Sequence, residues 1–188
     1  MKIIETQLEG VLIIEPSVYS DNRGFFMETY RRDRYKSEGI AVDFVQDNFS
    51  FSVQGTLRGL HYQQAPHPQA KLVQVMDGEI FDVAVDIRRN SPTFGQWTGI
   101  HLSGDNKRQF YIPEGFAHGF EVLSETAMFT YKCSDFYAPE CEKGIIWNDP
   151  DIGIEWTTTM PILSDRDRQM PRLKDIDSPS IQDLEGKK

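Results

Sequence analysis

The sequence has few cysteines and lacks a long hydrophobic run. Its two cysteines, Cys133 and Cys141, stand outside any CxxC arrangement, and two thiols in a chain of 188 residues form no disulfide framework. Near the N-terminus only a brief apolar run occurs, from Val11 to Ile14, which is shorter than a signal peptide or a membrane span requires. We therefore expect a cytoplasmic protein with reduced thiols.

Positive charge is also scarce. The chain has 20 Lys and Arg against 29 Asp and Glu, which gives a formal net charge of -9 at pH 7. Nucleic acids and anionic membranes need a contiguous basic face, so the charge balance argues against both partners. An anionic ligand must instead meet locally placed cations.

Enough apolar residues are present for a folded core. Hydrophobic residues make up 39% and aromatic residues 12% of the chain, and the length suits a single domain over residues 1–188. Beyond about Ser164 the sequence becomes charged and is interrupted by prolines. We expect residues 164–188 to form a segment packed on the main body and then a loose tail.

Short β-branched and aromatic runs, separated by Gly and Pro, predict an all-β fold. The Asp77-Gly78 pair between two apolar runs predicts a hairpin, and hence antiparallel pairing. One short helix is expected over residues 31–38, ended by Gly39, and the C-terminal stretch has room for another. Many strands with little helix indicate a barrel or jelly roll. The expected strands are residues 11–16, 24–30, 72–76, 80–87, 97–102, 109–112, 119–123 and 127–133.

Residues 113–118 have the Pro-x-Gly-x-x-His spacing that is typical of the second half of the cupin signature. The first half keeps its frame between Gly55 and Gly78 and retains His61. Gln63 replaces one histidine of the signature, however, and Lys71 replaces its acidic ligand. The chain therefore resembles the cupins, and the resemblance implies a jelly-roll β-barrel with a few short helices.

The altered signature argues against a metal. His61 and His118 are the only imidazoles left in the set, whereas a tight site needs three or four donors, and an ammonium group at position 71 repels a divalent cation. We expect no metal and no other cofactor. The charge of Lys71 would instead stabilise negative charge on a substrate oxygen.

These residue types suit enolisation. Removing a proton from carbon beside a carbonyl needs a positioned base and a cation for the enolate oxygen, for which His61 and Lys71 are the candidates. Reprotonation from the opposite face needs an acid, and the phenol of Tyr131 is neutral at pH 7. Asp167 is the candidate for the acidic group that orients His61. Two proton carriers on two faces indicate an epimerase.

Ordered segments from about residue 11 to residue 167 look like those of the dTDP-4-dehydrorhamnose 3,5-epimerase family. The resemblance implies a homodimeric enzyme that acts on dTDP-4-keto-6-deoxyglucose without a cofactor. It would invert carbons 3 and 5 to give dTDP-4-dehydro-L-rhamnose, on the route to dTDP-rhamnose. The segments are residues 21–26, 44–48, 57–61, 81–86, 91–95, 116–120 and 147–156.

The resemblance also assigns roles to individual residues. It makes His61 the base, Asp167 its orienting partner, Tyr131 the acid and Lys71 the enolate-stabilising cation. It brings three binding residues from the N-terminal strand region of the partner chain, namely Arg23, Phe26 and Glu28. The remaining binding residues are Gln46, Asp47, Asn48, Arg58, His118, Tyr137, Glu142 and Arg166, the last in place of the usual lysine.

The expected chemistry of binding follows from these residue types. Arg23 and Arg58 can bind a diphosphate as bidentate forks, and Phe26 or Tyr137 can stack on thymine. An ordinary interpretation as a core or surface residue also exists for the candidates His61, Lys71, Tyr131, Asp167 and Arg23.

Several functions remain open from the sequence. The same pocket would serve a 3-epimerase or a 3,4-ketoisomerase of a related dTDP-deoxysugar pathway. A non-catalytic cupin that binds a sugar nucleotide, or a metal-dependent dioxygenase or isomerase cupin, would belong to a different class. The sequence does not decide the preferred nucleotide, nor whether the product enters cell-surface polysaccharide or a secondary metabolite.

Overall fold

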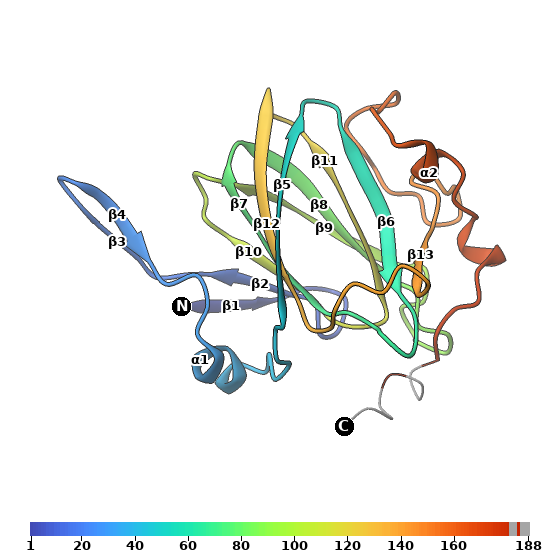
Figure 1. The fold of residues 1–188 in the computed structure, drawn as a ribbon, viewed down its shortest axis with the longest axis horizontal. Coiled ribbons are helices and arrows are strands. Elements are labelled where there is room, and N and C mark those ends of the chain that lie inside the picture. The colour runs from blue at the N-terminus through green and yellow to red at the C-terminus, as the bar shows by residue number, and fades with distance from the viewer. Residues whose placement is uncertain (181–183, 185–188) are drawn as a thin grey trace.

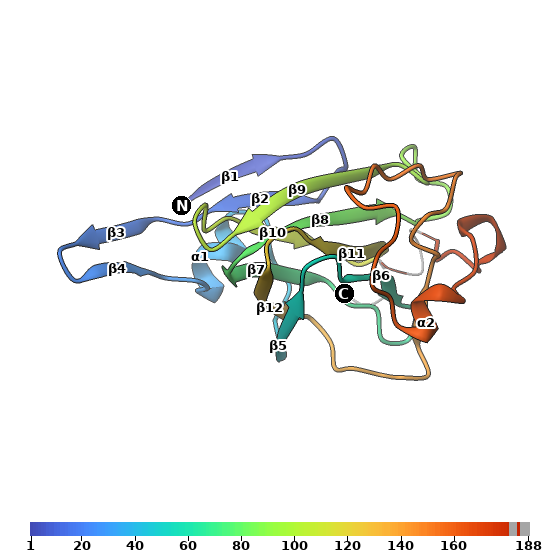
Figure 2. The same ribbon diagram turned by 90° about the horizontal axis from the view of Figure 1, so that it is seen from above.

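The computed structural model describes residues 1–180 and Leu184. Within these residues, two antiparallel sheets face each other, and a separate hairpin projects from their side (Figures 1 and 2). The six-stranded sheet has the order β1-β2-β10-β7-β12-β5, and the five-stranded sheet has the order β13-β6-β11-β8-β9. The strands are β1 (Lys2–Glu5), β2 (Leu12–Glu15), β3 (Val18–Asp21), β4 (Gly24–Met27), β5 (Gln46–Val53), β6 (Leu57–Gln63), β7 (Lys71–Asp77), β8 (Glu79–Asp86), β9 (Trp97–Ser103), β10 (Gln109–Ile112), β11 (Phe116–Val122), β12 (Thr126–Cys133) and β13 (Glu142–Gly144).

The main hydrophobic core lies between the two sheets. Side chains alternate along a strand, so every second residue points into this core. On β8, for example, Ile80 and Ala84 belong to the inner cluster, whereas Val83 and Val85 belong to a second cluster on the opposite face. Asp82 has the same parity as Ile80 and Ala84, which places a carboxylate on the inward face.

The outer faces of both sheets are partly covered. Helix α1 (Arg32–Ser37) covers one end of the six-stranded sheet, where its fully buried Tyr35 packs in a cluster with Leu72. The second cluster, on the five-stranded sheet, includes Leu173 from the 3-10 helix η1 (Leu173–Asp175). Neither α1 nor η1 covers the end of the sandwich where β5, β6, β7 and β12 carry polar residues, and this end is open.

Most of the predicted secondary structure is confirmed. Each of the eight expected strands overlaps an observed strand, the helix expected over 31–38 is α1, and a short helix α2 (Asp165–Arg168) lies in the C-terminal stretch. Strands β1, β3, β5, β6 and β13 were not predicted. All strand ladders within the described residues are antiparallel, as expected.

The hairpin predicted at Asp77-Gly78 is wrong. Strand β7 pairs with β10 and β12, whereas β8 pairs with β9 and β11, so the turn carries the chain from one sheet to the other. Gly78 has φ +81°, and a Cβ there would lie 2.1 Å from the backbone oxygen of Thr126. Glycine is therefore required by a tight crossing between sheets, and a local turn signal does not distinguish this crossing from a hairpin.

The segment after Ser164 contacts the barrel through α2 and Leu173, which is 5% exposed. The loose tail predicted beyond it includes residues 181–183 and 185–188, which lie outside the described residues. In the part of the chain that is described, no helix has the length and hydrophobicity needed to cross a membrane.

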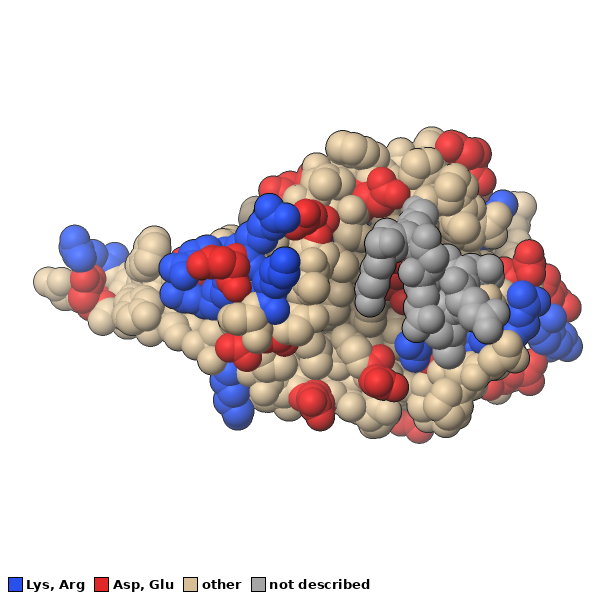
Figure 3. All heavy atoms as spheres, turned by 90° about the horizontal axis from the view of Figure 1, so that it is seen from below, with Lys and Arg blue, Asp and Glu red and all other residues tan. Residues whose placement is uncertain are grey.

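Basic side chains gather over α1, where acidic ones lie among them (Figure 3). Three of the arginines there are ion-paired with carboxylates at 2.9 Å or less. The positive charge of this cluster is thus locally compensated. The pairs are Arg31–Asp33, Arg32–Asp43 and Arg34–Glu28.

Candidate active site

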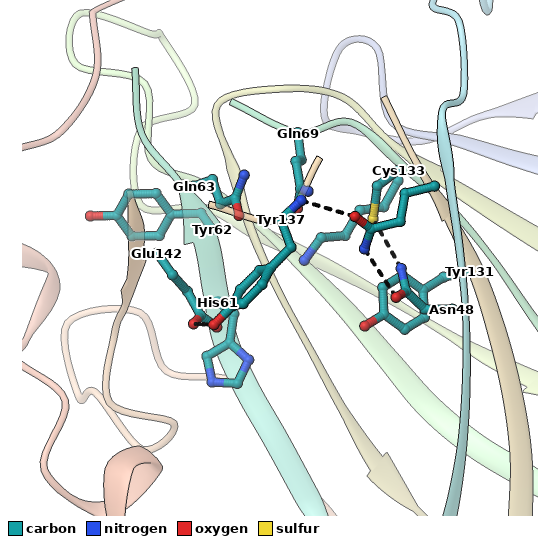
Figure 4. A pocket seen from close by; sticks show the side chains of 11 residues that line it. Asn48, His61, Tyr62, Gln63, Gln69, Tyr131, Cys133, Tyr137 and Glu142 are labelled. Atoms are coloured by element: carbon teal, nitrogen blue, oxygen red, sulfur yellow. Dashed lines mark hydrogen bonds between the residues drawn. The ribbon is translucent and has the colours of Figure 1, made fainter. Parts of the chain in front are cut away.

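Two adjoining cavities occupy the open end of the barrel. The outer one has a volume of about 310 Å³ and the inner one of about 190 Å³, and both are lined by His61, Lys71 and Tyr131. The outer cavity is also lined by Gln46, Asn48, Tyr62, Gln63, Gln69, Cys133, Tyr137 and Glu142 (Figure 4). The inner cavity is also lined by Ser50, Arg58, His118, Phe120 and Phe129.

The two sheets supply different parts of this site. His61 on β6 pairs with His118 on β11, in the five-stranded sheet. Lys71 on β7 pairs with Cys133 on β12, in the six-stranded sheet, and Tyr131 lies two residues earlier on β12. An imidazole from one sheet and an ammonium group from the other therefore face a common chamber.

His61 is held by a carboxylate from the C-terminal segment. Its Nε2 lies 2.6 Å from Oδ1 of Asp167, which is 3% exposed. Burial by itself would raise the pKa of Asp167, but the hydrogen bond and the charge of His61 bring the pKa below its ordinary value. Ser164 fixes this end of α2, because its Oγ accepts a hydrogen bond from Asp167 N at 3.1 Å. Asp167 thus occupies Nε2 and leaves Nδ1 for a ligand.

Lys71 is a partly buried cation that lines both cavities. Burial lowers its pKa, and the nearby negative charges of Asp82 and Glu142 oppose that shift. Its ammonium group makes no hydrogen bond or ion pair within the described part of the chain. A desolvated ammonium beside a cavity is costly for folding and is typical of a functional group.

A second histidine–carboxylate pair includes His118, which lines the inner cavity. His118 Nε2 is 2.9 and 3.0 Å from the two carboxylate oxygens of Asp82, and both residues are buried. Burial lowers the pKa of His118 and raises that of Asp82, while their attraction works against both shifts. The His118 ring also stacks on Phe129, with centroids 6.2 Å apart. Asp82 was not predicted as a site residue, although a carboxylate within the apolar run 80–85 was the available signal.

Two hydroxyl groups face the inner cavity with no hydrogen-bond partner among the described residues. Tyr131 packs against Phe129 at 5.4 Å, and burial raises the pKa of its phenol, which keeps it protonated at neutral pH. The Oγ atom of Ser50 is buried and unpaired. Arg58 reaches the same cavity, where its Nε donates to Ser52 Oγ at 3.2 Å. The chamber therefore offers both proton donors and a cation to a ligand.

A chain of contacts borders the outer cavity. Tyr137 Oη donates to Glu142 Oε2 at 2.7 Å, and the Arg166 guanidinium forms an ion pair with the same carboxylate. Burial alone would raise the pKa of Glu142, but Tyr137 and Arg166 bring it below the ordinary value. Gln46 and Asn48 are linked by a side-chain hydrogen bond of 3.0 Å. The structure thus brings these five predicted binding residues together.

Four predicted binding residues lie elsewhere in this chain. Asp47 has the opposite parity to Gln46 and Asn48 on β5, and its carboxylate pairs with Lys132 at 2.8 Å outside the two cavities. Arg23 and Phe26 lie on the projecting β3–β4 hairpin, where Phe26 is 71% exposed. Glu28 follows this hairpin and pairs with Arg34.

The facing sheets, with a polar chamber at one open end, define a cupin-type jelly-roll barrel whose chamber can bind and enolise a carbonyl compound. A family model described as dTDP-4-dehydrorhamnose 3,5-epimerase matches residues 5–175. The chain belongs to this family, and it is an enzyme of the isomerase class.

Individual relatives agree with this assignment. The chain is 54% identical over 177 residues to the dTDP-4-dehydrorhamnose 3,5-epimerase of Methanothermobacter thermautotrophicus, covering 93% of this chain and 95% of that protein. The dTDP-6-deoxy-D-glucose-3,5-epimerase of Legionella pneumophila, solved with dTDP-4-keto-L-rhamnose, has a TM-score of 0.93 and 54% identity, with 96% and 98% of the two chains covered. A 3'-monoepimerase from Streptomyces bikiniensis, solved with dTDP-quinovose, has a TM-score of 0.90 and 34% identity, with coverages of 96% and 94%.

Proposed function

We propose that this chain is a cofactor-independent epimerase that converts dTDP-4-dehydro-6-deoxy-D-glucose to dTDP-4-dehydro-L-rhamnose. The observation that carries the proposal is the shared chamber of His61, Lys71 and Tyr131. Carbons 3 and 5 of this sugar both flank the carbonyl at carbon 4. One cation at the carbonyl oxygen therefore serves enolisation at either carbon.

Each group has a role in this scheme. His61, oriented by Asp167, takes the proton from the carbon beside the carbonyl, and the carboxylate stabilises the imidazolium that forms. The ammonium of Lys71 stabilises the enolate oxygen, and burial strengthens this interaction because water screens it less. Tyr131 returns a proton from the opposite face, and exchange with solvent then removes the proton from His61 and restores the one on Tyr131.

We also propose that the nucleotide binds in the outer cavity and that a second copy of the chain completes it. Tyr137 would stack on the base in the outer cavity, and Arg58, which reaches the inner cavity, would contact the diphosphate where it joins the sugar. The projecting hairpin supports assembly as a homodimer, since its aromatic residues Tyr19, Phe25 and Phe26 are 65%, 57% and 71% exposed. Arg23, Phe26 and Glu28 would then act in the partner's site.

The location of the enzyme follows as part of the same proposal. Cys133 and Cys141 are both unpaired and buried, which suits a reducing compartment. We propose that the enzyme works in the cytoplasm as one domain.

A 3-epimerase is the second candidate, because the Streptomyces bikiniensis protein shares the fold at 34% identity. Incubation of dTDP-4-dehydro-6-deoxy-D-glucose in heavy water, followed by NMR of the product, separates the two. The proposed function predicts deuterium at carbons 3 and 5. Deuterium at carbon 3 alone would overturn the double epimerase in favour of the second candidate, and no deuterium would overturn both.

A further inference from the structure

Gln63 stands where the cupin signature has a metal-binding histidine, and its side chain has another task in this protein. The residue is 6% exposed and lies at the end of β6, at the wall of the outer cavity. Its Nε2 donates to His67 O at 2.7 Å and to Phe136 O at 3.2 Å, while its Oε1 accepts from Ala138 N at 2.8 Å. Both amide protons and the amide oxygen are therefore used.

Two of these three backbone groups, the carbonyl of Phe136 and the amide of Ala138, belong to the residues on either side of Tyr137. Gln63 holds the carbonyl of the residue before Tyr137 and the amide of the residue after it. From the opposite wall, Gln46 Oε1 accepts a hydrogen bond from Tyr137 N at 2.9 Å. Three consecutive residues, 136–138, are thus clamped by two glutamines that come from different sheets.

The clamp fixes the backbone around Tyr137, while the hydrogen bond from its hydroxyl to Glu142 holds the far end of the side chain. Tyr137 is 52% exposed and lies on a loop rather than in a strand, yet its ring borders the cavity (Figure 4). An exposed loop residue loses conformational entropy when a ligand orders it, and a preorganised loop has already lost that entropy before binding.

We propose that Gln63 is a positioning residue that preorganises Tyr137 for the nucleotide part of the substrate. The inference rests on the proposed function, because it needs a nucleotide in the outer cavity. The position that holds a metal ligand in the cupin signature would thus contribute to substrate affinity in this protein. Gln63 contacts none of His61, Lys71 and Tyr131 through a side-chain hydrogen bond, so the chemical step is expected to remain.

The test compares Gln63→Ala and the nearly isosteric Gln63→Glu with wild type. A carboxylate can still accept from Ala138 N, but it cannot donate to the two carbonyl groups and repels them. We expect both variants to raise KM for the sugar nucleotide and Kd for dTDP alone by about five- to twentyfold, with kcat within about twofold. Gln54→Ala is the matched control, since Gln54 also donates to a backbone carbonyl, Leu123 O at 2.8 Å, but away from the cavities.

A second comparison separates positioning from general stability. In a Tyr137→Ala background, Gln63→Ala should weaken dTDP binding by no more than about twofold further, because the residue being positioned is gone. Equal losses in both backgrounds, a fall in kcat with KM unchanged, or no change in dTDP affinity would each overturn the inference. If wild type itself neither binds dTDP nor exchanges substrate protons, the proposed function fails instead.

Discussion

The imidazole of His61 and the carboxylate of Asp167 are joined by a contact of 2.6 Å although the two residues are 106 positions apart. This contact fixes which ring nitrogen faces the cavity. Asp167→Asn should lower kcat by about 10²- to 10⁴-fold, because an amide no longer stabilises the imidazolium or enforces the tautomer. The neighbouring, exposed Asp165 offers a control, and steady-state rates of Asp165→Asn should match wild type. Equal losses in both variants would contradict the assignment.

The pKa of Lys71 predicts the pH dependence of the enzyme. Burial lowers this pKa, so the ammonium form is lost at a lower pH than for an ordinary lysine. A plot of kcat/KM against pH should therefore fall on its alkaline side as Lys71 deprotonates. Lys71→Arg keeps its charge over the whole range. Its alkaline fall in kcat/KM should therefore move to higher pH, whatever its absolute rate. An unchanged limb in Lys71→Arg would assign it to another group.

Lys71 should also lower the stability of the fold at neutral pH. A group whose folded pKa lies below its unfolded pKa disfavours folding wherever the unfolded chain is protonated, and this cost shrinks as pH rises between the two values. Lys71→Met is therefore expected to raise the free energy of unfolding at pH 7, while turnover falls by about 10²-fold or more. Urea denaturation measures the first effect, with Lys143→Met as an exposed control that changes it by less than about 0.5 kcal/mol. A less stable Lys71→Met protein would show that the ammonium has a stabilising partner.

Removal of the phenol should separate proton abstraction from proton return. In Tyr131→Phe, His61 can still take a proton, but the opposite face lacks its donor. We expect solvent deuterium to enter the recovered substrate while net epimerisation slows by about 10²-fold or more. NMR of the substrate and product pools distinguishes the two events. Epimerisation at the wild-type rate would remove Tyr131 as the acid.

The sequence indicated the fold class better than the arrangement of the sheets. The apolar runs predicted eight strands, seven of them in the two facing sheets, but β5 was missed because its pattern is inverted: Asn48 and Ser50 face the cavity, while Phe49 and Phe51 are exposed. Strand β6 was missed for a similar reason, since site residues such as Arg58 and His61 interrupt its apolar pattern. A strand whose inward positions are mostly polar lacks the apolar alternation on which the prediction relied.

The site was predicted unevenly for a related reason. The cupin spacing and the family resemblance pointed to His61, Lys71 and Tyr131, which the structure brings together. Neither could show that Gln63 clamps a loop or that Asp82 bonds His118, because both contacts join segments far apart in the chain. The roles of Arg23, Phe26 and Glu28 stay a prediction from the family resemblance, since local spacing carries no signal for a contact between chains.

Mixing two inactive variants tests whether Arg23 acts in the partner's site. If it does, a mixed dimer of His61→Asn and Arg23→Ala has one site with both residues intact and one with neither. After subunit exchange, activity should recover to about a quarter of wild type, because about half of the dimers are mixed and half of their sites are intact. No recovery above the separate variants, despite dimers in sedimentation measurements, would place Arg23 and His61 in the same chain's site, and an active Arg23→Ala protein would make Arg23 dispensable.

Proton removal by His61 from the carbon beside the ketone is the central step of the proposed function. Its most direct test is the rate at which solvent deuterium enters dTDP-4-dehydro-6-deoxy-D-glucose with His61→Asn, measured together with the Kd for dTDP. We expect that rate to fall by about 10²- to 10⁴-fold while Kd stays within about twofold of wild type. Deuterium entry at the wild-type rate, with the nucleotide still bound, would contradict the claim.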